Sequence, residues 1–143
     1  MEPTITAHDR IVIHELLARL DHAVDAQDWD GYLAHFTDDA VLDSGFAGEV
    51  RGREAIRAWL VQNEGNTAGK RHVASNVYVD LGNRMATARS YLTVLEREDV
   101  PRVVATAVIT DALVKDGEVW RVARHQVRVD PGMFKAFAAA ASG

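Results

Sequence analysis

The 143 residues predict one compact domain, residues 1–143, and their 48% hydrophobic and 26% charged composition is typical of globular proteins rather than disordered or fibrous ones. The net charge of −5 argues against a nucleic-acid partner, which needs a basic surface, and the absence of cysteine excludes thiolate nucleophiles, disulfides and Cys-ligated zinc. No apolar run approaches the ~20 residues needed to cross a bilayer and residues 1–4 are acidic, so we expect a cytoplasmic protein without a membrane partner.

Helical periodicity dominates the first half of the chain. Thr6 and Asp9 have the spacing of a capping box, and the apolar residues that follow predict a helix over about 8–26. Asp28 can cap a second short helix whose apolar face lies within residues 29–36. The other elements expected in this half are a strand over 40–43, a loop over 45–52 and a helix over 54–61.

From residue 70 onward the apolar period changes to two, which is typical of strands. On the first strand, one predicted face carries His72, Ala74, Asn76 and Tyr78. Further strands are expected over about 84–96, 102–115 and 118–130, and a short helix over 132–140. Helices followed by consecutive antiparallel strands predict an α+β domain in which a curved sheet covers a helical layer and leaves a concave pocket.

Six local motifs carry a resemblance that spans nearly the whole chain. They are Leu16-Leu17-Ala18-Arg19 leading to Asp25, Asp28-Trp29-Asp30, Phe36-Thr37-Asp38-Asp39-Ala40, Gly52-Arg53-Glu54-Ala55-Ile56, Arg71-His72 with Asn76, and Asp116-Gly117-Glu118-Val119-Trp120. In this order they resemble the SnoaL-like family of the nuclear transport factor 2-like superfamily. The resemblance implies a cone-shaped half-barrel, with a curved, mostly antiparallel sheet wrapped around the N-terminal helices.

Asp25 and His72 are the candidate catalytic residues. Neutral imidazole is well matched to proton abstraction near pH 7, and a carboxylate on its other nitrogen fixes the tautomer. Both residues match the Asp–His pair of the scytalone dehydratase, bile acid 7α-dehydratase and hexachlorocyclohexane dehydrochlorinase branch. Leu20, Val24 and Leu95 stand where relatives carry polar helpers, so the donors for leaving-group departure are not reproduced. The structural alternative is that Asp25 caps a turn and His72 is an ordinary sheet residue.

Candidate substrate-binding residues are chosen for their predicted position near the pocket. They are Asn76, Tyr78, Trp29, Phe46, Trp59, Tyr91, Leu95, Arg124, His125 and Arg128. On the last strand, Arg124 and Arg128 alternate on the predicted face of Trp120, whereas His125 is on the other face, and either set could line the cavity. The competing interpretation is ordinary core packing for the apolar residues and solvated charge for the arginines.

The motifs that would hold a cofactor are missing. Asp38-Asp39 has no partner at metal-site spacing, His14-Glu15 is not followed by a second histidine at the required position, and the glycines form no phosphate-binding loop. We therefore expect no metal and no cofactor. The resemblance implies a lyase of the dehydratase type, or an isomerase, acting on a small hydrophobic metabolite, cyclic ones included. Alternatives are a noncatalytic binding or assembly subunit and a polyketide cyclase or epoxide hydrolase. A homodimer or homotrimer is also expected.

Overall fold

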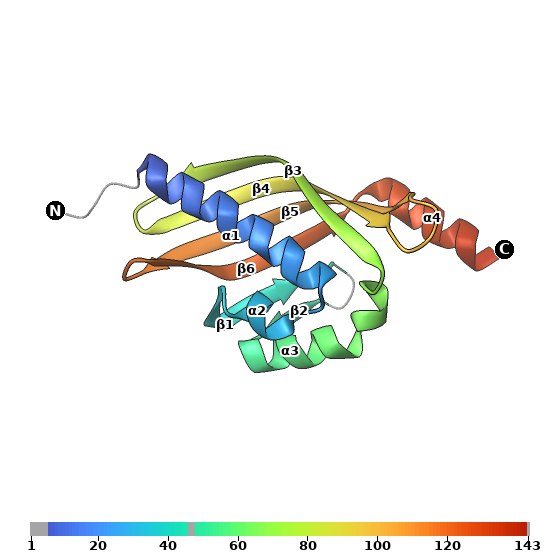
Figure 1. The fold of residues 1–143 in the computed structure, drawn as a ribbon, viewed down its shortest axis with the longest axis horizontal. Coiled ribbons are helices and arrows are strands. Elements are labelled where there is room, and N and C mark those ends of the chain that lie inside the picture. Colours follow the sequence, from blue (N-terminus) through green and yellow to red (C-terminus); the bar gives the residue numbers. More distant parts are fainter. Residues whose placement is uncertain (1–5, 46–47, 143) are drawn as a thin grey trace.

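The computed structural model describes residues 6–45 and 48–142 (Figure 1). Its helices are α1 (Ala7–Asp25), α2 (Trp29–Leu33), α3 (Arg53–Gln62) and α4 (Pro131–Ser142), and η1 (Glu64–Asn66) is a short 3₁₀ turn. Its strands are β1 (Phe36–Asp43), β2 (Glu49–Arg51), β3 (Lys70–Leu81), β4 (Met85–Glu96), β5 (Val103–Asp116) and β6 (Val119–Val129).

The strands form one sheet in the order β2-β1-β6-β5-β4-β3. Every neighbouring pair is antiparallel except β1 and β6, which are parallel. α1 crosses the face of the curved β3–β6 sheet, α2 and α3 lie beside β1 and β2, and α4 extends away from the sheet (Figure 1). The expected α+β class, with a curved and mostly antiparallel sheet around N-terminal helices, is confirmed.

The amphipathic pattern of α1 fixes how the helix lies on the sheet. Ile13, Leu16, Leu17 and Leu20 are buried along one side of α1 and join the core. Burial of each such side chain contributes on the order of 1.5–3 kcal/mol. The predicted capping box at Thr6 is present and begins the helix one residue earlier than expected.

A buried ionic cluster fastens the start of α1 to the β5–β6 hairpin. Asp9 Oδ1 accepts hydrogen bonds from Trp120 Nε1 at 2.9 Å and from Lys115 Nζ at 3.0 Å. Asp9 Oδ2 accepts a hydrogen bond from the Thr6 backbone N–H at 2.8 Å. The Thr6 N–H, Trp120 and Lys115 together hold the pKa of the Asp9 carboxyl well below its usual value. This carboxylate therefore positions one end of α1 over the sheet.

The segment after α2 differs from the sequence prediction. Asp28 caps α2 through the Gly31 N–H, as expected, but α2 ends at Leu33, and β1 begins at Phe36 instead of residue 40. Phe36 pairs with Val122 of β6, and this pairing holds it in an extended conformation. The expected loop over 45–52 also contains β2, a three-residue strand too short for its alternation to be recognised.

Two bulges reverse the predicted faces of β3 and β6. In β3 the register shifts between Ser75 and Tyr78, where Asn76 adopts a left-handed conformation with φ 53°. In β6, Leu113 pairs with Val122 and Ala112 with Arg124, so the intervening residue has no partner. One extra residue inverts the alternation beyond it, because successive side chains point to opposite faces.

The bulges decide which side chains face inward. Beyond the β3 bulge the buried position is Val79, and Tyr78 is exposed. On β6, Trp120 and Val122 are buried before the bulge, and His125 and Val127 line the interior after it. The expectation that the arginines of this strand share the face of Trp120 is therefore wrong.

Within the described residues, no helix is both long and apolar enough to span a membrane.

Candidate functional site

A cavity of about 270 Å³ lies between α1 and the curved sheet. Its wall is mainly apolar and includes side chains from α1, α2, α3 and all four long strands. The polar or titratable residues on the wall are Asp21, Tyr32, Ser44, Asn66, His72, Ser90, Asp111 and His125. A concave apolar space with a few convergent polar groups is the usual form of a small-molecule site.

His72 and Asp25 form a hydrogen-bonded pair at one end of this cavity. His72 Nδ1 lies 2.8 Å from Asp25 Oδ1, and the same oxygen accepts the His72 backbone N–H at 3.0 Å. An ionised carboxylate can only accept, so the shared proton is on Nδ1 and the neutral ring has its lone pair on Nε2. The two side chains are 14% and 20% exposed, respectively, so the pair is shielded but reachable.

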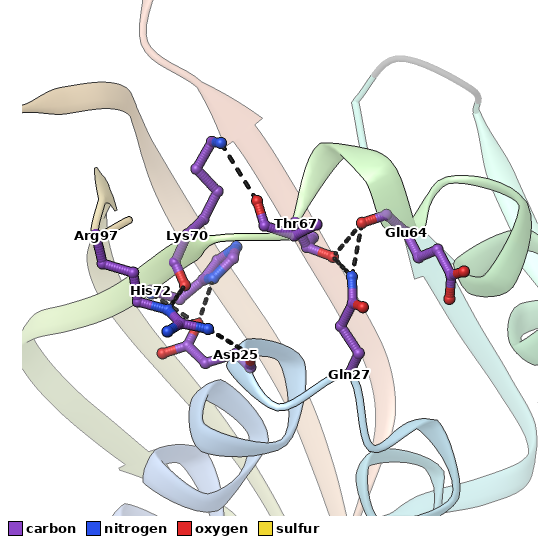
Figure 2. Close-up of polar contacts among 8 residues, drawn as sticks. Asp25, Gln27, Glu64, Thr67, Lys70, His72 and Arg97 are labelled. Atoms are coloured by element: carbon purple, nitrogen blue, oxygen red, sulfur yellow. Dashed lines mark hydrogen bonds and ion pairs between the residues drawn. The ribbon is translucent and has the colours of Figure 1, made fainter. Parts of the chain in front are cut away.

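Figure 2 shows how the chain around this pair is braced. Arg97 donates from Nη2 to the Asp25 carbonyl oxygen at 3.3 Å and from Nε to the Lys70 carbonyl oxygen at 2.9 Å. Gln27 adopts a left-handed conformation with φ 53° and donates to the Glu64 carbonyl oxygen at 2.7 Å. Strain of this kind costs on the order of 1 kcal/mol, which these contacts offset. The end of α1 is thus fixed against the start of β3, where His72 lies.

A wider surface groove of about 640 Å³ runs along the outside of α1 and β3. It shares Leu17, Asp21, His72 and Ala74 with the inner cavity, and Asp25 also lies on its wall. His72 therefore separates the groove from the cavity and contacts both spaces.

A second His–Asp pair lines the same cavity. His125 Nδ1 on β6 lies 2.5 Å from Asp111 Oδ1 on β5, and the two residues are directly paired across the strands. Asp111 is only 4% exposed. Burial alone would lower the pKa of His125, but the charge and hydrogen bond of Asp111, together with the charge of Asp21, outweigh burial and raise that pKa above its usual value.

Asp21 lies one helical turn before Asp25 and faces both spaces. Burial raises the pKa of the Asp21 carboxyl to about 7; nearby His125 opposes this rise, whereas Asp111 and Asp25 add to it. Tyr32 is buried beside the same acids. Burial, and to a smaller extent the charges of Asp111 and Asp21, raise the pKa of the Tyr32 phenol above its usual value, so this phenol stays protonated.

Several predicted substrate-binding residues lie away from the cavity. Trp59 and His125 line it. Asn76 is exposed at the bulge, Tyr78 is exposed beyond it, and Tyr91 and Leu95 occupy the β4 positions that alternate with the inward-facing ones. Their predicted position at the pocket is wrong for these four. Asn76 lies in the β3 bulge, which inverts the faces beyond it, and Tyr91 and Leu95 are on the outer face of β4.

The remaining candidates have other structural roles. Trp29 is buried in the core and is absent from the cavity wall. Arg124 and Arg128 both bind Asp43 Oδ2, at 3.2 and 3.0 Å, instead of facing the cavity. Phe46 lies outside the described residues.

The sequence prediction overlooked Asp111 and Asp21 as cavity residues. Asp111 occupies an inward position on β5 between Ile109 and Leu113, and a carboxylate at an apolar-face position was a usable signal. Asp21 precedes Asp25 by four residues and so shares a helix face with it, which was a weaker signal. Among residues 6–45 and 48–142, no three His, Asp or Glu side chains gather as a metal site.

The family of the chain follows from its sequence. The sequence model of the SnoaL-like domain matches residues 6–126. The chain belongs to the SnoaL-like domain family. No curated protein matches it.

Solved structures share the fold of this SnoaL-like chain. A protein of unknown function with a cystatin-like fold from Nostoc punctiforme is 35% identical, with a TM-score of 0.84 over 93% of this chain and 98% of that one. A protein from Catenulispora acidiphila, solved in complex with S-DNPA, is 26% identical, with a TM-score of 0.78 over 91% and 99%. ActVI-ORFA from Streptomyces coelicolor is 22% identical, with a TM-score of 0.75 over 85% and 97%, a likeness of fold alone.

Proposed function

We propose that this protein is a cofactor-independent lyase of the dehydratase type, or an isomerase, that uses His72 as base and Asp25 as its orienting partner. The SnoaL-like family and the fold support the broader assignment to small-molecule chemistry. The finer assignment depends on one observation, the Asp25–His72 pair at the wall of an apolar cavity.

The geometry suits proton abstraction from carbon. Because Nδ1 is held by Asp25, the lone pair on Nε2 is the one available to a bound molecule. Asp25 also stabilises the imidazolium that forms when Nε2 takes the proton. A positioned base of this kind contributes typically 10²–10⁴-fold to a rate.

The cavity restricts the substrate to small hydrophobic molecules. Its volume of about 270 Å³ lies just below the usual range of ligand pockets, roughly 300–1,000 Å³. The Catenulispora acidiphila structure was solved in complex with S-DNPA, which supports small-molecule binding by this fold. We therefore expect a compound of one or two rings with a carbonyl group beside the acidic C–H bond.

An elimination probe tests the assignment of the base. The para-nitrophenyl ether of the benzaldehyde–acetone aldol releases para-nitrophenolate once a proton beside its ketone is removed, and the release is followed by visible absorbance. We expect the wild-type protein to accelerate this release. His72→Gln and Asp25→Asn are each expected to lower kcat/KM by roughly 100-fold, the usual contribution of a positioned base.

His8→Gln is the matched control, because His8 is exposed in the first turn of α1 and lies outside the cavity. This variant also replaces a histidine by glutamine, and it is expected to leave the rate of phenolate release unchanged. Full turnover by His72→Gln would overturn the assignment of the base. Saturable binding of the probe without any turnover would favour a noncatalytic binding subunit instead.

A further inference from the structure

The second His–Asp pair, His125 and Asp111, is held by a hydrogen bond like the first, and it has no role in proton abstraction by His72. His125 is anchored through Nδ1 to Asp111, which leaves Nε2 for a bound molecule. The ring of Phe36, which is fully buried, contacts the imidazole edge-on with ring centroids 6.5 Å apart. Both the hydrogen bond and this aromatic contact fix the orientation of the imidazole.

Both imidazoles can contact one bound molecule. His72 and His125 line the same cavity, whose volume of about 270 Å³ is small enough for one bound molecule to fill. They come from β3 and β6, which β4 and β5 separate in the sheet, and both side chains line the cavity. A small ligand between them is therefore presented with two imidazole nitrogens from different directions.

The surroundings of His125 favour its protonated form. Asp111 from β5 bonds to it directly, and Asp21 from α1 and Tyr32 from α2 line the same cavity. These carboxyl groups raise the pKa of His125 despite its burial. A protonated imidazole offers an N–H donor at Nε2.

We propose that His125, held by Asp111, is a second catalytic residue that protonates the departing oxygen, so that the cavity eliminates water from a small β-hydroxy ketone. This proposal rests on the proposed function, in which His72 is the base. It supplies from β6 the leaving-group donor that the sequence alone did not provide.

The step balances without any further reactant. His72 Nε2 takes the proton from the carbon beside the ketone, and the electron pair of the C–H bond becomes the new C=C bond. The C–O bond to the neighbouring carbon breaks, and its electron pair takes the proton from His125 Nε2, so that water leaves. His72 ends protonated and His125 neutral, and exchange of one proton with solvent at each ring restores the starting state.

Two substrates that differ only in the leaving group separate the acid from the base. The benzaldehyde–acetone aldol loses hydroxide as water, whereas its para-nitrophenyl ether loses a stable phenolate, and both give the same ultraviolet-absorbing enone. For the aldol, we expect His125→Gln to lower kcat/KM by about 100-fold or more and to remove the alkaline limb of the pH profile. For the ether, less than about a fivefold loss is expected, because this leaving group needs no proton.

The pattern across variants distinguishes the two proposals. His72→Gln is expected to slow the reaction of both substrates. Full activity of that variant on both would refute the assignment of His72 as base, whereas the role of His125 is tested by how the loss in His125→Gln depends on the leaving group. An equal loss on both substrates in His125→Gln, or no loss on the aldol, would overturn the role of His125. Absence of wild-type turnover on both substrates would overturn elimination from this class of ketone. The glutamine side chain of His125→Gln can still donate to Asp111, and circular dichroism checks that the variant folds.

Binding of para-nitrophenol gives a second measurement that needs no turnover. Its phenolate and phenol forms absorb differently, so the spectrum reports the charge of the bound molecule. We expect wild-type protein and His8→Gln to bind the phenolate, because the imidazolium of His125 stabilises it. His125→Gln is expected to shift the bound ratio toward the neutral phenol by about tenfold, and Asp111→Asn, which keeps the imidazole, to shift it in the same direction. An unchanged ratio in His125→Gln would overturn the proposal.

Discussion

Replacing Asp21 by asparagine is expected to stabilise the protein at alkaline pH. The pKa of Asp21 is about 7 in the folded chain, against an ordinary value of 3.8. Between these values the folded protein retains a proton that the unfolded chain has lost, so the contribution of Asp21 to the free energy of unfolding falls as the pH rises from about 4 to about 7. At about 1.36 kcal/mol per pH unit, the full difference is about 4 kcal/mol.

The expected gain is smaller than this ceiling, because the Asp21→Asn substitution also removes a negative charge that favours protonated His125. We expect Asp21→Asn to raise the free energy of unfolding by about 2–4 kcal/mol at about pH 8 and by much less at about pH 4. Urea unfolding at both pH values measures it. Asp39→Asn, which removes an exposed carboxylate on β1, is the control and is expected to change stability by less than about 0.5 kcal/mol at either pH. A difference between Asp21→Asn and wild type that does not vary with pH would refute the reasoning.

Three further changes test other parts of the fold. Asp9→Asn removes the charge that pairs with Lys115 and Trp120, and we expect urea unfolding to show a loss of about 2–3 kcal/mol; an unchanged midpoint would contradict the role given to this cluster. Asn76→Val is expected to lower the melting temperature through strain at positive φ, costing roughly 1–2 kcal/mol, whereas Asn76→Gly is expected to be neutral or better; equal melting temperatures for both would argue against the bulge. Arg97→Met removes the contacts that join α1 to β3, so hydrogen exchange at the end of α1 is expected to accelerate about tenfold, and unchanged exchange would show that the brace is dispensable.

Periodicity predicted the four long strands to within a residue or two, but it could not predict the orientation of every side chain. The rule of alternation assumes an unbroken ladder, and one extra residue in β3 and one in β6 invert the faces beyond them. Asn76 gave a modest signal, because Asn tolerates left-handed backbone better than other residues do. The β6 bulge gave none, since Ala123 is ordinary in any strand. His125 was therefore assigned to the face opposite Trp120, although both point inward.

The pairing of Asp25 with His72 was accessible only through the family resemblance. The two residues are 47 positions apart, and no local pattern joins the end of a helix to a particular strand. Asp111 and His125 are 14 positions apart on the two arms of one hairpin, so their proximity is a matter of register. That register depends on the bulge, which is why the second pair was missed while the first was found.

Burial gives the two pairs different places in the proposed reaction. Asp25 is 20% exposed and lies on the wall of the outer groove, so a proton that His72 has taken can pass to water on that side. Asp111 is 4% exposed and closed in by the core, so the charge of His125 is held by buried carboxyl groups until a leaving oxygen arrives. A base must lose its proton to solvent after each turnover, whereas an acid must hold its proton until the leaving oxygen arrives and regain one from solvent afterwards. The two imidazoles are about equally exposed, 14% for His72 and 16% for His125, so either ring can exchange a proton with solvent. The carboxylates are what differ, and the more exposed Asp25 suits the partner of a base whereas the buried Asp111 suits the partner of an acid that stays charged.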